Sequence, residues 1–119
     1  MKPMKIKQIV LDSRDVKALA AFYEKLLGWE KIYEAEDFVG LSLPSGGPYL
    51  CIQREMEYTP VDWPQSGAGV HFDILVEKDA MQETVEYAIS CGAKKAEEQY
   101  SENWTVMLDP QGHPFCFDT

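Results

Sequence analysis

The chain of 119 residues carries 20 acidic and 11 basic side chains, so its formal net charge is −9 at pH 7. This charge argues against a nucleic-acid-binding surface, because phosphate contacts require clustered positive charge. Hydrophobic residues make up 45% and charged residues 26% of the chain, which excludes a disordered or fibrous protein. We therefore expect one compact domain.

Targeting signals and disulfides are not indicated. The chain has no run of about 18 apolar residues and no apolar segment of secretory length near its start, so we expect a cytoplasmic protein that does not contact a membrane. The cysteines are Cys51, Cys91 and Cys116. Their odd number and the lack of a Cys-x-x-Cys spacing favour reduced thiols over a disulfide framework.

The first half predicts a strand, a helix and three short strands. A strand over 5–12 is rich in β-branched residues. A helix follows, with Asp15 as the expected N-cap and Gly28 as the left-handed residue that ends it. Apolar residues between them form one helical stripe, namely Val16, Leu19, Ala20, Tyr23, Leu26 and Leu27. The three strands are expected over 29–35, 38–43 and 49–54.

The second half repeats this order after a linker. Residues 55–69 contain two prolines and two glycines without any periodicity, so we interpret them as a linker. A strand over 70–76 and a helix over 79–91 follow, and further strands are expected over 94–99, 104–108 and 114–117. Gln82 stands three residues after Asp79, which predicts a capping box at the start of this helix.

Markers of the two halves recur at an almost constant offset, which indicates an internal repeat. Asp15 and Asp79, like Gly28 and Gly92, are 64 residues apart, whereas Gly47 and Gly112, like Cys51 and Cys116, are 65 apart. Each half is too small to bury its own apolar sheet face. We therefore predict an α+β fold of two tandem βαβββ modules, about 1–54 and 70–119, which form a curved mixed sheet around a cleft, with the helices outside.

Alternation along the strands separates two faces of this sheet. The face turned away from the helices collects Gln8, Tyr49, Cys51, Gln53, His71, Asp73 and Cys116. A solvated sheet face also carries polar residues, but Cys is among the most buried residue types. We therefore favour a semi-enclosed face that binds a small molecule.

Large aromatic residues lie in the loops near this predicted cleft. Tyr58 and Trp63 belong to the linker, and Tyr100 and Trp104 flank the loop 101–103. Aromatic residues in loops without periodicity are candidates for a lid over an apolar ligand. We therefore include Trp63 and Trp104 among the expected ligand-binding residues. The alternative is that Trp63 only holds the other module or a second subunit.

Four segments resemble the superfamily of glyoxalases, bleomycin-resistance proteins and extradiol dioxygenases, also called vicinal oxygen chelate. They are QIVLDSRD at 8–15, AFYEKLLG at 21–28, VHFDILV at 70–76 and DPQGHPFCF at 109–117. The resemblance covers essentially the whole chain and implies a glyoxalase-like domain with a small-molecule ligand. It also implies a homodimer, because many relatives pair their modules between subunits. The segments are mostly structural and say little about the substrate.

The resemblance also implies positions for a metal. Enzymes of the superfamily commonly hold a divalent metal with one side chain from the first and one from the last strand of each module, which here are Gln8, Cys51, His71 and Cys116. Gln and His serve at these places in glyoxalases, but the metal enzymes usually place Glu where this chain has cysteines. Glyoxalase isomerisation needs a metal-bound carboxylate as base, and extradiol cleavage needs two His and one carboxylate around iron. The ligand set for either reaction is therefore incomplete.

The two cysteines leave two interpretations open. With His71, and with Gln8 or water as a fourth ligand, they form a soft ligand set for zinc or nickel. Alternatively they are small apolar residues that fill space and no cofactor is bound, which we favour because buried free cysteines usually behave in this way.

Two function hypotheses follow. The first is a lyase, isomerase or oxygenase-type enzyme with His71 as its catalytic residue, while Asp73 either orients this imidazole or accepts backbone N–H groups. The second is a non-catalytic protein that sequesters a drug or metabolite, as bleomycin-resistance proteins do, for which the net charge of −9 favours a cationic ligand. For His113, in the turn before the last strand, we expect a structural or solvent-exposed role.

Overall fold

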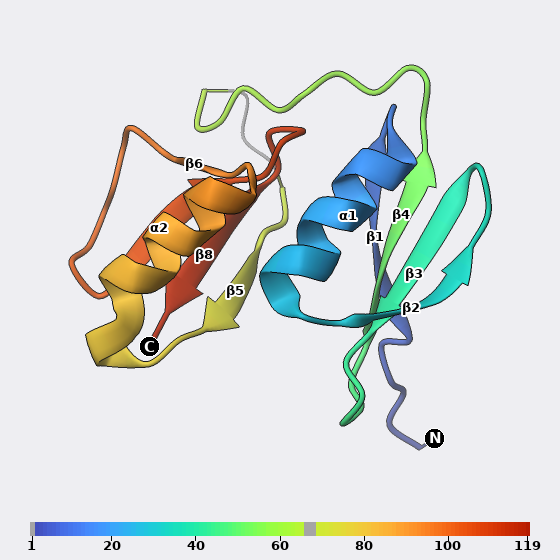
Figure 1. Cartoon of the computed structure of the whole chain (residues 1–119), viewed down its shortest axis with the longest axis horizontal. Helices are drawn as coiled ribbons and strands as arrows, with labels where there is room; N and C mark the ends of the chain where they lie inside the picture. The colour runs from blue at the N-terminus through green and yellow to red at the C-terminus, as the bar shows by residue number, and fades with distance from the viewer. Residues whose placement is uncertain (1, 66–68) are drawn as a thin grey trace. The chain divides into compact units, whose positions relative to one another are not determined.

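The computed structural model describes residues 2–65 and 69–119, and residues 66–68 of the expected linker lie outside the described part. The chain divides into two compact units, Met1–Tyr58 and Thr59–Thr119. Each unit has its own helix and its own four-stranded sheet (Figure 1). Within the described ranges, no helix has both the length and the apolar character needed to cross a bilayer.

The two units repeat one topology. The elements of the first are β1 (Gln8–Ser13), α1 (Val16–Leu27), β2 (Glu30–Glu34), β3 (Phe38–Ser42) and β4 (Tyr49–Arg54). The second contains β5 (Phe72–Leu75), a 3-10 turn η1 (Lys78–Ala80), α2 (Met81–Cys91), β6 (Lys94–Lys95), β7 (Trp104–Leu108) and β8 (Pro114–Asp118). The strand orders are β1-β4-β3-β2 and β5-β8-β7-β6. The α+β fold of two tandem βαβββ modules is confirmed, whereas the joining of both sheets around one cleft stays a prediction.

Helix α1 begins and ends as its sequence predicts. The Asp15 carboxylate accepts a hydrogen bond of 3.1 Å from the N–H of Ala18, and Gly28 closes the helix at φ 69°. The buried side of α1 contains Val16, Leu19, Ala20, Phe22 and Tyr23, and the core strands contribute Val39, Leu41, Leu50 and Ile52, none of them more than 4% exposed. Burial of this apolar area supplies most of the stabilisation of a helix of this length.

Helix α2 begins differently, and the capping box predicted at Asp79 is wrong. The 3-10 turn contains Asp79, and the α-helix starts after Ala80, which has no side chain that can cap it. Gln82 instead donates a 3.5 Å hydrogen bond to Glu86, one helical turn further on. The tighter turn shifts the first turn of the α-helix beyond the reach of the Asp79 carboxylate.

The strand expected over 94–99 is much shorter, because a side chain takes over its hydrogen bonds. Strand β6 pairs with β7 at Lys94 and Lys95, and one more backbone hydrogen bond of 3.0 Å runs from the Ala96 N–H to the Val106 carbonyl. Beyond them the Gln99 amide donates to the carbonyls of Ala96 and Val106 and accepts from the N–H of Val106 at 2.8 Å. One side chain thus satisfies backbone groups that a longer ladder would have paired.

The part of the expected linker that follows residue 58 belongs to the second unit. A Cβ added to Gly112, at φ 87°, would lie 2.8 Å from the carbonyl oxygen of Val61, so only glycine allows this close approach. The Trp63 ring packs against the buried cluster that contains Val106 and lies 5.9 Å from the Tyr100 ring in an edge-to-face arrangement. Residues 59–65 therefore cover part of the second module.

The turn before β8 is held by a buried carboxylate. Asp109, 4% exposed, accepts hydrogen bonds from the N–H groups of Gln111 and His113 and lies 2.8 Å from Nδ1 of the His113 ring. The expected structural role of His113 agrees with this geometry.

The two helix starts offer a matched test of capping. We expect Asp15→Ala to lower the free energy of unfolding by about 1 kcal/mol, because the cap hydrogen bond is lost. Asp79→Ala should change it by less than about 0.5 kcal/mol, as expected for an exposed residue without a cap role. Urea unfolding of both variants measures the difference, and equal losses would contradict the assignment of the caps.

Candidate functional site

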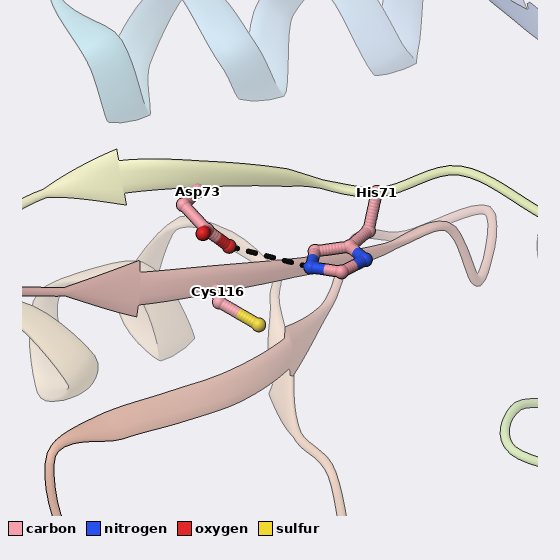
Figure 2. Close-up of side chains that lie close together, drawn as sticks. All are labelled: His71, Asp73 and Cys116. Atoms are coloured by element: carbon pink, nitrogen blue, oxygen red, sulfur yellow. Dashed lines mark ion pairs between the residues drawn. The ribbon is translucent and has the colours of Figure 1, made fainter.

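Three chemically active side chains meet on one face of the second sheet. Asp73 of β5 lies directly opposite Cys116 of β8 in the parallel register, and His71 precedes Asp73 by two residues, so it shares the same face. One ligand atom from each residue lies within 4.8 Å of the others (Figure 2). We call these residues the His71–Asp73–Cys116 cluster.

The cluster has two exposed members and one buried member. The His71 Nε2 and Asp73 Oδ1 atoms are 3.4 Å apart, and the two side chains are 55% and 51% exposed. Cys116 is only 6% exposed and packs with Ala96 and Val106. The Cys116 thiol therefore lies between apolar residues on one side and the pair of His71 and Asp73 on the other.

The surroundings of Cys116 keep its thiol protonated. The pKa of Cys116 is raised to about 11, mainly by burial, and the negative charge of Asp73, a hydrogen bond with the Asp73 carboxylate and the charge of Asp118 contribute to this shift. At neutral pH and without a bound cation, this cysteine is therefore a neutral and poorly nucleophilic group.

The first sheet carries a pocket instead of such a cluster. We call it the first-module pocket; its volume is about 420 Å³ and it is lined by Lys7, Gln8, Ile32, Tyr33, Phe38, Gly40, Tyr49 and Cys51. Gln8 lies opposite Tyr49 in the β1–β4 register, and Cys51 lies opposite Gly40 in the β3–β4 register. Burial raises the pKa of the Cys51 thiol, which the charge of Lys7 partly opposes.

A glycine in the middle of β3 opens this pocket. A Cβ on Gly40 would lie 3.7 Å from Cys51 Sγ, 3.7 Å from Ile32 and 3.8 Å from Tyr33, which are ordinary contact distances. The missing side chain, rather than a strained backbone, therefore leaves part of this space unfilled. Gly40 was not among the residues predicted from the sequence, although a glycine inside a strand signals a close approach or a ligand. Lys7, Tyr33 and Phe38 were not predicted either.

The remaining predicted residues are divided between the modules. Gln53 donates a 2.7 Å hydrogen bond to Asp12 across β1 and β4. Trp63 packs against the cluster of Val106, and Trp104, 38% exposed, lies on β7 two residues before Val106 and thus on the same face. The predicted metal set of Gln8, Cys51, His71 and Cys116 is distributed over both units and stays a prediction.

The raised thiol pKa predicts a loss of stability at alkaline pH. Because the folded pKa of Cys116 lies above the ordinary value of 9.0, the protonated thiol stabilises the metal-free fold below pH 9.0, and this contribution is lost as the pH rises towards about 11. Urea unfolding at a series of pH values should show a smaller alkaline loss in Cys116→Ala than in the wild type. Identical pH profiles would contradict the assignment.

Solved structures resemble the chain over nearly its full length. A glyoxalase/bleomycin resistance protein/dioxygenase family enzyme from Burkholderia phytofirmans is 22% identical, with a TM-score of 0.78 over 97% of this chain and 98% of that chain. A mutant of the fosfomycin resistance protein FosX from Listeria monocytogenes, complexed with Mn(II) and 1S,2S-dihydroxypropylphosphonic acid, is 16% identical, with a TM-score of 0.77 over 98% of this chain and 90% of that chain. A possible glyoxalase from Bacillus cereus is 16% identical, with a TM-score of 0.75 over 98% and 100%. These likenesses establish the fold.

The sequence itself matches one family. No curated protein sequence matches the chain. The glyoxalase-like domain family, in contrast, matches residues 8–117, which include both modules from β1 to β8. The chain therefore belongs to the glyoxalase-like domain family.

Proposed function

We propose that the chain binds a small organic molecule in the first-module pocket. The observation that carries this proposal is the pocket of about 420 Å³ beside Gly40, which lies between aromatic and polar side chains. Ligand sites commonly have volumes of about 300–1,000 Å³ and combine apolar walls with a few polar groups. The pocket has both properties within a single module.

The lining of the pocket indicates the chemistry of the ligand. Tyr33 and Phe38 form an edge-to-face pair with ring centroids 6.0 Å apart, which supplies an apolar wall. Gln8 and Tyr49 add hydrogen-bonding groups, and Lys7 is the charged residue of the lining. A partly apolar molecule with a carboxylate or phosphonate group matches these walls.

This local chemistry differs from the cationic ligand expected from the net charge of −9. Charges farther away than about 8–10 Å are largely screened at physiological salt, so a lining lysine has more influence on a bound ligand than the distant carboxylates. The FosX mutant, which shares the fold, is known in complex with a small phosphonic acid. We therefore favour an anionic ligand over a cationic one.

The second module provides the natural test of the pocket. Val106 lies opposite Cys116 as Gly40 lies opposite Cys51, and Val106 is 3% exposed. A valine is therefore compatible with this place in the sheet, where it fills the space that Gly40 leaves open. An alanine in place of Gly40 would add only ordinary contacts.

We expect Gly40→Val to fold and to weaken ligand binding by about tenfold or more, a change of about 1.4 kcal/mol. Gly40→Ala should retain most of the affinity. A panel of small carboxylates, phosphonates and amines, screened by the rise in melting temperature of each variant, measures the effect.

Two results of this screen would contradict the proposal. One is a wild-type protein whose melting temperature no compound raises. The other is a compound that stabilises Gly40→Val as much as the wild type, which would place its binding site elsewhere. Stabilisation by amines alone would overturn the preference for an anionic ligand.

A second candidate function is catalysis of proton transfer by His71. The observation that favours it is the 3.4 Å distance between the exposed imidazole and the Asp73 carboxylate, because a carboxylate orients an imidazole that exchanges protons with a ligand. In this reaction His71 would be the catalytic residue, and Asp73 would be a positioning residue.

The two candidate functions differ in whether the ligand is consumed. If the chain is an enzyme, NMR spectra of a stabilising compound should change with time, and His71→Gln should slow this change by about 10²–10⁴-fold. Asp79→Ala, which changes an exposed residue outside both candidate sites, should leave the change unaltered. A compound that binds and remains unchanged would contradict catalysis and leave sequestration as the function.

A further inference from the structure

We propose that the His71–Asp73–Cys116 cluster is a zinc site that is complete within the second module. Among the residues that the structure describes, this is the one group of three potential ligands whose donor atoms lie within 4.8 Å of one another. The proposal does not depend on the first-module pocket, which lies in the other unit.

The distances agree with a tetrahedral ion. Zinc binds imidazole nitrogen and carboxylate oxygen at about 2.0–2.2 Å, so two such ligands of a tetrahedron lie about 3.4 Å apart. The His71 Nε2 and Asp73 Oδ1 atoms are 3.4 Å apart. A sulfur ligand at about 2.3 Å requires about 3.6 Å to each of the others, and in the cluster these distances are at most 4.8 Å. Rotation of the exposed imidazole and carboxylate can supply the remaining adjustment.

The donor chemistry selects the metal. Calcium and magnesium prefer sets of oxygen ligands, whereas a nitrogen, an oxygen and a sulfur ligand together suit a borderline-soft ion such as zinc. Three protein ligands leave one tetrahedral position for water or for a ligand oxygen, as in zinc sites that perform chemistry. The charges of Asp73 and Asp118, which act on the Cys116 thiol, attract a cation and help it to replace the thiol proton.

The proposed set differs from the one that the family resemblance implies. That set takes Gln8 and Cys51 from the first module, whereas the proposed site takes Asp73, a residue outside the four implied positions. Asp73 supplies the carboxylate that is missing where Cys116 replaces the usual Glu. The thiol of Cys116 and the carboxylate of Asp73 thus lie on the neighbouring strands β8 and β5.

The corresponding positions of the first module lack both the carboxylate and the imidazole of the cluster. Val10 lies opposite Cys51 in the same parallel register in which Asp73 lies opposite Cys116. Gln8 occupies the place of His71, two residues earlier on the strand. The repeat-related position therefore has a thiol but neither the imidazole nor the carboxylate, which makes Cys51 a matched control for Cys116.

Cobalt(II), a spectroscopic substitute for zinc, tests the proposal directly. We expect metal-free protein to bind one cobalt ion per chain with the near-ultraviolet charge-transfer band of a cobalt–thiolate bond, and zinc to abolish this band. Cys116→Ser should lose the band, and Cys51→Ser should keep it. Asp73→Asn and His71→Gln should weaken binding by more than about tenfold, because loss of a ligand costs at least as much as loss of an outer-shell partner.

The outcomes separate this proposal from its competitors. Equal loss of the band in Cys51→Ser and Cys116→Ser would overturn it in favour of a set shared by both modules, and a wild type without the band would exclude a thiolate site. Asp73→Asn and His71→Gln change exposed side chains and so remain folded, which urea unfolding verifies, even if replacement of a buried cysteine unfolds the chain. Gly40→Val should bind cobalt like the wild type, so failure of the pocket and failure of the metal site are distinguishable.

Discussion

The parallel pairing of the first and last strands is the constraint on which both modules depend. It brings β1 beside β4 and β5 beside β8, although about 40 residues of chain separate the partners in each pair. The register of this pairing places Val10 opposite Cys51 and Asp73 opposite Cys116. A slip by one residue would turn every side chain of a strand to the other face, so it would remove the candidate sites together with the core.

On this common frame the two modules have become different. Their strand orders and their registers correspond, but a glycine in β3 stands where β7 has a buried valine. The first sheet has a pocket beside Cys51. In the second sheet Val106 fills the space beside Cys116, and the pair of His71 and Asp73 lies next to it. A duplicated fold can thus offer one module for a ligand and the other for a reactive group, without any change in its hydrogen-bonded framework.

The two repeat-related cysteines illustrate this divergence. Both are buried and both have a raised thiol pKa, as the interpretation of small space-filling residues requires. Around Cys51 the neighbouring charge is that of Lys7, whereas Cys116 lies beside the carboxylates of Asp73 and Asp118. The same residue type at the same position of the repeat therefore has different electrostatic surroundings in the two modules.

Local patterns in the sequence determined much of this protein. The repeat, the alternation of the strands and the cap at Asp15 depend on neighbouring residues, and they sufficed to predict the modules and the polar face that carries His71, Asp73 and Cys116. The start of α2 and the short β6 were decided by tertiary structure, since a 3-10 turn and the side chain of Gln99 replaced the expected local interactions. The pocket at Gly40 and the meeting of Asp73 with Cys116 also depended on it, because strand register alone decides which distant residues become neighbours.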